Sequence, residues 1–488
     1  MDQSPALFDF SPYLAQREEV LRLIHEFASH DAFRSAAVEE LELDDAFYRR
    51  PLRPEDLEFL RFQKPVPAQN ISRLPSLATQ RLLLSLNEVG VARLPRRQVP
   101  GEFERFDAFY GERNQVLGAR IRPFLEHYGF TFLGREASRD DGVAAYVERL
   151  RALIEHEKAF WADMFALLVR NDYLVEGLRF VMIQRWSLAP SRRVAVERAA
   201  ASGCFDMVAD ADRPRLAPQT DDPLLAAVAG FAGVTKRAHS YWQFYLPTSM
   251  AGCNLLHALG ARPDRAFALL GAAFASEAAA VAFSDALALA CPHLVARDAP
   301  ARGVDAAAEL VARFERALCA VDARYGAEGR FRAGQGVGAG IRMAERARWD
   351  LGEQLKWLSS IDRYIEFARR IDRRIAAECP NIDRETFVEP RDMCSTTHVH
   401  NDHRLVVIQS SAPAGTVQMH FWGNLGMCLE MRQGDKVLIP DGRLHGSTVL
   451  SDECTYDQPI IPDEWIAELL GEAAARPAAA ATPATAAA

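Results

Sequence analysis

The first four fifths of the chain repeat their hydrophobic residues every three or four positions, which is the period of amphipathic helices. Residues 11–130 show this pattern, broken into short pieces by prolines, and it begins at Ser11 and Pro12, a helix-start signal. Longer helical runs follow from about 145 to 295. The run at 266–291 is apolar almost throughout, which places it at the centre of a helical bundle. We expect a helical packing or dimerisation module followed by a bundle.

Two further stretches lie between the bundle and the end of the helical part. Residues 326–340 carry alternating glycines, but no strand precedes them and no Lys-Ser/Thr pair follows, so they do not form a phosphate-binding loop. We predict a flexible connection there. Residues 341–376 are rich in charge at helical spacing and predict one long helix. Pro380 and Pro390 then mark a domain boundary.

Beyond that boundary the hydrophobic period changes to two. The runs LVVIQ, TVQMHFW and MCLEM alternate as the strands of a small antiparallel barrel do. The fold class is therefore multidomain and mainly α, with a small all-β barrel at the end. Five segments are predicted: 1–135, a helical packing or dimerisation module; 136–340, a helical bundle; 341–380, a connecting helix; 381–466, the β barrel; and 467–488, a disordered Ala/Pro tail.

Composition limits the classes of function. A net charge of −9 over 488 residues argues against nucleic acid as the main partner. The eight cysteines are scattered without a C-x-x-C pair, which favours a reducing compartment and argues against a disulfide framework or a thiolate zinc site. No secretory signal opens the sequence, and Glu277 and Asp285 interrupt the longest apolar run, so we expect no membrane span and a cytoplasmic location.

The barrel segment carries a metal-binding pattern. His398 and His400 alternate on one face of a strand, and a third histidine, His445, follows the turn residues Pro440 and Gly442. Three imidazoles on one face can hold one divalent ion. We predict a metal site made of these three histidines.

Several other residues are candidates for this chemistry. Asp402 shares the face of the first two histidines and is a further candidate ligand, whereas His403 and His420 are more typical of surface or strand positions. Tyr456, in the strand-like CTYDQPII, could supply a catalytic hydroxyl; its alternative role is packing. Glu277 lies in the apolar run, where a lone carboxylate must either bind a metal or pair with a buried Arg or Tyr.

The barrel resembles the cupin family. Its second half matches the second cupin motif at Gly434, Pro440, Gly442 and His445, although Val449 stands where Asn is common. The His-x-His of the first motif is present, but Arg404 and Leu405 occupy the places of its usual Glu. The resemblance therefore implies a three-histidine site with an open face for substrate and O2. Iron is favoured by the resemblance, while the ligands alone would also suit zinc.

The whole chain resembles the three-domain N-nitrosourea-forming enzymes of streptozotocin biosynthesis and their relatives. The resemblance is strongest at HVHNDH, at GDKVLIPDGRLHG and from YWQFYLPTSM to AAFASEAA. It implies a helical module that forms a homodimer, a haem-oxygenase-like diiron bundle that hydroxylates guanidine nitrogens, and a cupin whose Fe(II) rearranges the product and makes an N–N bond. His398, His400 and His445 match the cupin ligands, and Glu277 falls where the bundle supplies a diiron carboxylate.

The remaining diiron ligands of that family are not matched. No histidine occurs between His293 and His398, and residues 205–225 contain neither Glu nor His. A diiron site needs about four carboxylates and two histidines on facing helices. We predict that the bundle is degenerate as an oxygenase and that a diiron centre is not complete there.

The resulting hypothesis is an O2-dependent, non-haem iron cupin enzyme of specialised-metabolite biosynthesis. Its substrate would be a small N-hydroxylated amino acid or guanidine, supplied by a companion N-oxygenase or carrier protein, and it would form an N–N bond. Two alternatives stay open. The chain could be a non-catalytic partner of an N-oxygenase, or an ordinary cupin dioxygenase. Neither nucleic acid nor a membrane is an expected partner.

Overall fold

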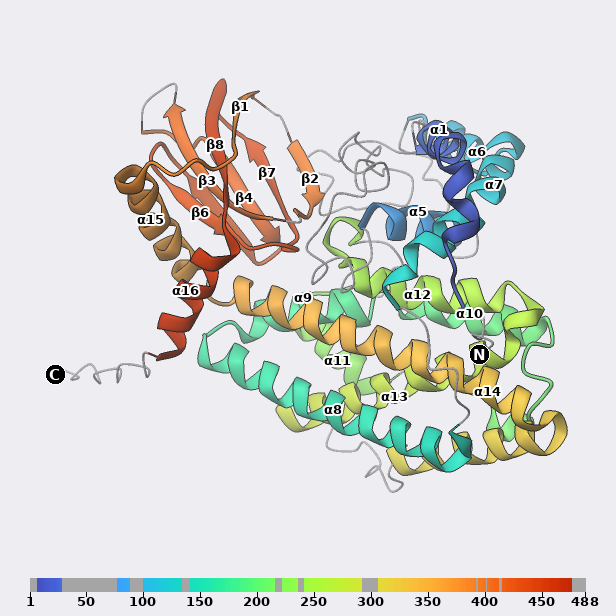
Figure 1. Ribbon diagram of the computed structural model, residues 1–488. Coiled ribbons are helices and arrows are strands. Elements are labelled where there is room, and N and C mark those ends of the chain that lie inside the picture. The colour runs from blue at the N-terminus through green and yellow to red at the C-terminus, as the bar shows by residue number, and fades with distance from the viewer. Residues whose placement is uncertain are drawn as a thin grey trace, which may run out of the picture. The chain divides into compact units, whose positions relative to one another are not determined.

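The computed structural model describes residues 7–28, 77–87, 100–133, 141–215, 222–235, 241–291, 306–391, 394–400, 402–411 and 415–475. The chain forms two compact units, one helical and one mainly β (Figure 1). The first unit is Met1–Ser359 with the short segments Cys394–Thr397 and Gly423–Met427, and the second is Ser360–Met393 with His398–Trp422 and Cys428–Ala488. The predicted fold class, helical domains followed by a small β domain, is confirmed. The expected boundary at 135 falls outside the described residues.

The helices of the first unit are short at the start and long later, as their sequence pattern predicted. Its described α-helices are α1 (Arg17–Ala28), preceded by the 3-10 turn η1 (Ser11–Gln16), then α5 (Leu77–Asn87), α6 (Glu102–Tyr110), α7 (Glu112–Gly129), α8 (Gly142–Arg170), α9 (Leu174–Arg185), α10 (Ala189–Ala201), α11 (Pro223–Phe231), α12 (Pro247–Gly260), α13 (Ala266–Ala290) and α14 (Ala306–Leu358).

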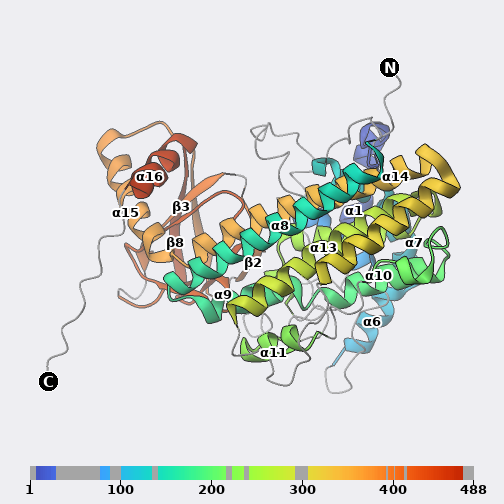
Figure 2. The same cartoon turned by 90° about the horizontal axis from the view of Figure 1, so that it is seen from below.

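Three long helices, α8, α13 and α14, lie side by side and form the centre of this unit (Figures 1 and 2). Helix α13 is buried along most of its length because its sequence offers almost no polar face. Aromatic rings fill the spaces between the helices. Trp161 of α8 packs on Phe283 of α13 with ring centroids 4.6 Å apart, and Phe274 of α13 packs on Phe314 of α14 at 5.1 Å.

The flexible connection predicted for 326–340 is wrong except at its first residue. The label α14 covers two helices that meet at a kink at Gly326, where φ is 65°, and the residues from 327 to 340 are helical. The glycines that follow serve close packing on α13: a Cβ on Gly336 would lie 1.9 Å from the carbonyl oxygen of Ala268, and one on Gly271 would lie 2.1 Å from that of Ala333. The small residues let the two helix backbones touch, so their role is tertiary and not local.

Helix α13 with the turn before it, Pro263–Ala290, is long and apolar enough to cross a membrane by length and composition. However, 78% of its most apolar window is buried inside the protein. A helix buried to this extent is a core helix, in agreement with its packing against α8 and α14.

The second unit begins with α15 (Ile361–Glu378), a strongly amphipathic helix. The predicted single helix over 341–376 is therefore wrong, since α14 ends at Leu358 and α15 is a separate helix. The strands follow as β1 (Arg384–Pro390), β2 (Cys394–His398), β3 (His403–Ser411), β4 (Met419–Asn424), β5 (Met427–Met431), β6 (Lys436–Ile439), β7 (His445–Val449) and β8 (Glu453–Ile461). They form two four-stranded sheets, in the orders β1-β8-β3-β6 and β2-β7-β4-β5.

Helix α15 packs against β6, where Asp372 pairs with Lys436. The last described helix, α16 (Asp463–Ala475), packs on α15: Arg374 bonds Glu468 at 2.8 Å and lies over the ring of Trp465. The tail predicted as disordered from 467 is thus helical up to residue 475, because Trp465, Ile466 and Leu469 give this segment an apolar face to bury. Residues 476–488 lie outside the described part.

Candidate metal centre

The structure brings the three predicted histidines together. His398 ends strand β2, His400 follows it, and His445 begins strand β7. Their candidate ligand nitrogens all lie within 4.8 Å of one another. The ring centroids are 4.8 Å apart for His398 and His400, 4.4 Å for His398 and His445, and 5.0 Å for His400 and His445. Among the His, Cys, Asp and Glu side chains of the described residues, these three histidines form the group whose spacing suits a metal ion.

The turn before β7 fixes the direction of His445. Gly442 adopts φ of 72°, a conformation that glycine reaches without strain, and its N–H donates to the carbonyl oxygen of His400 at 2.7 Å. The Nδ1–H of His445 donates to the carbonyl oxygen of Arg443 at 2.8 Å. Since a carbonyl oxygen can only accept, Nδ1 carries the proton and Nε2 is left as the ligand atom.

The environment keeps the imidazoles of His400 and His445 neutral, which is the form that binds a metal. Burial lowers the pKa of His445 to about 4. Burial also lowers the pKa of His400 well below its usual value, helped by the neighbouring His398 and His445. The Nε2 atom of His400 is buried and has no hydrogen-bond partner in the described residues. A buried nitrogen without a partner is costly in a folded protein, so this donor set fits a bound divalent ion.

Arg404 occupies one of the positions where the first cupin motif usually has a glutamate ligand. Its Nε donates to Asp402 at 2.8 Å, and its Nη1 donates to Glu385 at 2.8 Å and to Gln458 at 3.2 Å. The carboxylate of Asp402 is thus used by Arg404 and does not join the three histidines in the described cluster. The candidate centre therefore has three histidines, and a cation that is paired with two acids lies beside it.

Tyr456 lies in strand β8, buried, and stacks on Phe387 with ring centroids 5.2 Å apart. Alternate residues of a strand share a face, so Tyr456 lies on the same face of β8 as Gln458, which bonds Arg404. Tyr456 is therefore on the side of the sheet that carries Arg404. Its catalytic role stays a prediction.

The two spare histidines have other places. The Nδ1 atom of His403 accepts a hydrogen bond from the backbone N–H of Asp441 at 3.0 Å. His420 lies in β4, where its neighbour Phe421 stacks on the ring of His445 at 5.5 Å. Sequence reasoning missed Phe421 as part of the site. The alternation in TVQMHFW was the available signal, since it places Phe421 and His420 on opposite faces.

Glu277, the fourth predicted metal ligand, lies in the other unit, in α13. Its carboxylate pairs with the buried Arg313 of α14 and accepts from the backbone N–H of Arg215 at 2.6 Å. Burial raises the pKa of Glu277, and Arg313 opposes that shift. Both oxygens are thus engaged by nitrogen donors. Glu277 is thus the partner of a buried arginine in this structure, and no metal-site grouping of the described residues includes it; its role as a metal ligand stays a prediction.

Comparison with known proteins gives one relevant similarity. No protein-family model matches the chain. The chain is 28% identical, over 446 residues, to the nitrosourea synthase of Streptomyces achromogenes subsp. streptozoticus, and this similarity covers 84% of the chain and 89% of that protein. The similarity extends over both units, and it confirms the expected resemblance.

Proposed function

We propose that this chain, a relative of the streptozotocin-type nitrosourea-forming enzymes, is a non-haem iron cupin enzyme of specialised-metabolite biosynthesis. The relative is a nitrosourea synthase, which supports a biosynthetic enzyme that forms N-nitroso compounds. The observation that carries the iron part of the proposal is the cluster of His398, His400 and His445, with candidate ligand nitrogens within 4.8 Å.

The three histidines would hold the ion through neutral imidazole nitrogens. Fe(II) bound there would supply redox chemistry with O2, the oxidant of the proposed reaction. No carboxylate joins the three histidines in the described cluster, so a ligand carboxylate would not offset the charge of the ion. That arrangement suits a substrate that binds through an anionic oxygen, such as the N–O group of an N-hydroxylated nitrogen.

The protein's own residues would prepare this site. The hydrogen bond from His445 to Arg443 holds the ring so that Nε2 faces its partners. Phe421 stacks on that ring and excludes water from one side of it. Asp402 and Glu385 hold the Arg404 guanidinium in place, which keeps a fixed positive charge near His400 and His445. We assign the Tyr456 hydroxyl the transfer of a proton to or from the substrate.

The proposed substrate is a small N-hydroxylated amino acid or guanidine, and the proposed reaction is its oxidative rearrangement with N–N bond formation. Glu277 is paired with Arg313, which supports the proposal that it does not serve as a diiron carboxylate. A companion N-oxygenase would therefore supply the hydroxylated nitrogen. We place the reaction in the cytoplasm and the enzyme in a homodimer.

The same observation about Glu277 favours a second candidate, a non-catalytic partner of an N-oxygenase. In that case the helical unit would dock the companion enzyme, and the histidine cluster would bind a metal without turnover. The two functions predict different oxygen consumption. They do not predict different metal content.

The test begins with protein purified without oxygen and loaded with one equivalent of Fe(II). Oxygen uptake and an N–N bonded product are measured with an N-hydroxyguanidine derivative of arginine as the probe. We expect uptake with the wild type and none with His400→Ala, while His420→Ala serves as the matched control and keeps activity. Tyr456→Phe should retain iron and lose turnover. Iron-loaded wild type that consumes no oxygen with this probe would favour the partner role.

A further inference from the structure

The helical unit contains a cavity of about 90 Å³ that is separate from the histidine cluster. Residues of six helices, α9, α10, α11, α12, α13 and α14, line it. Its wall is apolar on one side, with Leu255, Leu256 and Met343, and carries hydroxyl groups from Thr248, Ser249 and Ser276. At ~10–15 Å³ for each water-sized position, it has room for roughly six to nine heavy atoms. That is the size of a small metabolite.

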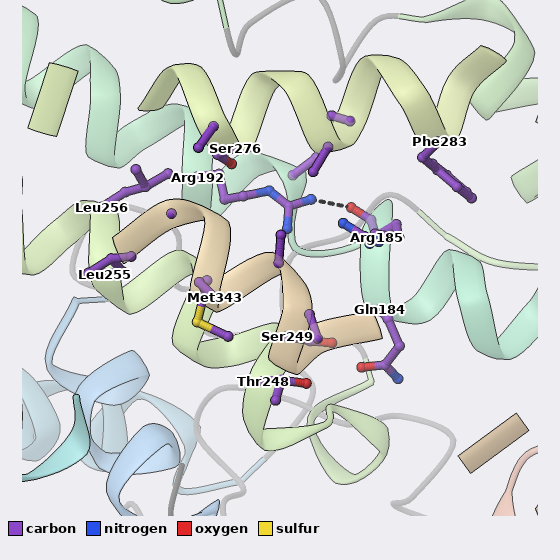
Figure 3. A pocket seen from close by; sticks show the side chains of 18 of the residues that line it. Gln184, Arg185, Arg192, Thr248, Ser249, Leu255, Leu256, Ser276, Phe283 and Met343 are labelled. Atoms are coloured by element: carbon purple, nitrogen blue, oxygen red, sulfur yellow. Dashed lines mark hydrogen bonds between the residues drawn. The ribbon is translucent and has the colours of Figure 1, made fainter. Parts of the chain in front are cut away.

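A guanidinium lies in this cavity. The side chain of Arg192 extends into the space lined by Ser249, Ser276 and Met343, and its Nη2 donates to the carbonyl oxygen of Arg185 at 2.6 Å (Figure 3). No carboxylate lies within ion-pair distance of Arg192 in the described part of the chain, whereas the next residue, Arg193, reaches Glu197 at 3.6 Å. The charge of Arg192 thus faces the cavity without an acidic partner.

Two buried acids lie beside the cavity wall. Glu157 is fully buried, and its carboxylate accepts from Arg348 at 2.7 Å and from the Trp161 indole at 3.1 Å, with Arg185 3.7 Å away. Burial lowers the pKa of Arg185 to about 10, so this side chain stays charged at neutral pH. The second acid, Asp350, accepts from the hydroxyl of the cavity residue Thr248 at 2.7 Å. The three arginines, Arg185, Arg192 and Arg348, thus outnumber the two carboxyl groups.

Two helix N-termini add to this field. Helix α10 begins at Ala189, which lines the cavity, and Arg192 lies in its first turn. Helix α12 begins at Pro247, and the cavity residues Thr248 and Ser249 follow directly. The N-terminal end of a helix favours anions through its exposed N–H groups and its dipole. The same positive potential disfavours a metal cation at this place.

We propose that this cavity binds a small aliphatic carboxylate. Arg192 would be the counter-ion of the carboxylate, and the apolar wall of Leu255, Leu256 and Met343 would contact the hydrocarbon part. A carboxylate matches the planar fork of a guanidinium, and the hydroxyls of Ser249 and Ser276 can donate to it, whereas Thr248 already donates to Asp350. The apolar wall favours an organic acid over inorganic phosphate, which has no hydrocarbon to bury. The site does not involve the histidine cluster, so it stands or fails independently of the proposed iron chemistry.

The test is calorimetric titration of the full chain with 4-methylpentanoate, whose eight heavy atoms fit the space, and with the neutral 4-methylpentanamide of the same shape. Arg192→Gln removes the counter-ion. Arg193→Gln is the matched control, since it removes the same charge one position away. Ala280→Leu fills the cavity from α13 at a partly exposed position. Circular dichroism verifies that each variant is folded.

We expect saturable binding of the carboxylate to the wild type and to Arg193→Gln, and affinity lower by about tenfold or more for Arg192→Gln and for the amide, because a charge-assisted pair is lost. Ala280→Leu should weaken the binding of the acid as well. The iron-free His400→Ala variant should bind as the wild type does, which separates this site from the histidine cluster. Equal affinity of Arg192→Gln and wild type, or equal binding of inorganic phosphate and 4-methylpentanoate, would overturn the proposal.

Discussion

The Nδ1–H of His445 donates a hydrogen bond of 2.8 Å to the carbonyl oxygen of Arg443, two residues before it. The bond is local, so the turn that starts strand β7 also selects the imidazole tautomer. The ring presents Nε2 toward His398 and His400, whose centroids lie 4.4 Å and 5.0 Å away. Fold and chemistry are therefore coupled at this turn.

The first prediction concerns metal content. His445→Ala should lower bound iron from about one equivalent per chain to near zero, because two imidazoles hold a divalent ion far more weakly than three. His420→Ala, on the neighbouring strand β4, should keep the wild-type content. Elemental analysis of anaerobically purified protein measures both. Retention of a full equivalent by His445→Ala would show that the cluster does not hold the metal.

The second prediction concerns the buried ion pair of Glu277 and Arg313. Glu277→Ala should destabilise the helical unit by about 3–5 kcal/mol, because the Arg313 charge is left buried and unpaired. Iron content should not change. Glu309→Ala is the control: Glu309 bonds the half-exposed side chain of Arg215 at 2.9 Å, and its loss should cost less than about 1 kcal/mol. Thermal unfolding followed by far-UV circular dichroism measures the difference.

An opposite result for Glu277 would be informative. Loss of iron together with wild-type stability would make this carboxylate a metal ligand and restore the diiron interpretation of the bundle. The double variant Glu277→Leu with Arg313→Met should recover much of the lost stability, since replacing both members of a buried pair with apolar residues is often neutral.

The third prediction concerns the contact between α13 and α14. Gly336→Ala places a Cβ 1.9 Å from the backbone oxygen of Ala268, so the helices must separate and the melting temperature should fall by many degrees. Gly230→Ala is the control, because nothing lies within 4 Å of a Cβ there and the site is helical and exposed. It should stabilise by about 0.5–1 kcal/mol. Equal effects of the two changes would show that Gly336 does not mediate close packing.

The sequence predicted the parts of this protein whose signal is local. The His-x-His pair is recognised from three adjacent residues, although His400 lies just after the end of β2 and not in the strand, and the turn residues Pro440 and Gly442 precede His445 directly. The helix start at Ser11 and the central position of α13 follow from neighbouring residues as well.

The sequence pattern does not reveal features that depend on partners distant in the chain. Glycines such as Gly336 are typical of loops when only their neighbours are considered, and their helical role needs the α13 backbone beside them. Glu277 has its partners at Arg313 and Arg215, which are 36 and 62 residues away. Nothing in the local pattern distinguishes a metal ligand from a buried ion pair. The cavity around Arg192 is likewise built by six helices and has no signature in any one of them.

The last prediction concerns pH and His257, which is buried in α12 and contacts Ser191. Burial, with Arg198 and Arg122 nearby, lowers the pKa of His257 to about 3, whereas an unfolded histidine titrates near 6.5. Between pH 3 and pH 6.5, His257 is therefore protonated in the unfolded state and neutral in the folded state. Stability from this group is complete above pH ~6.5 and is lost as the pH falls toward 3, by up to ~1.4 kcal/mol per pH unit.

Replacing the imidazole should remove this dependence. His257→Gln should lose less stability than the wild type between pH 6.5 and 4.5, with the difference growing as the pH falls. The exposed residue His156 of α8 gives the control His156→Gln, which should follow the wild-type curve. Urea unfolding of the helical unit, followed by circular dichroism at several pH values, measures the three curves. Parallel curves for His257→Gln and wild type would contradict this prediction. They would mean that His257 binds its proton equally well in the folded and in the unfolded protein, so that its pKa is not lowered by folding.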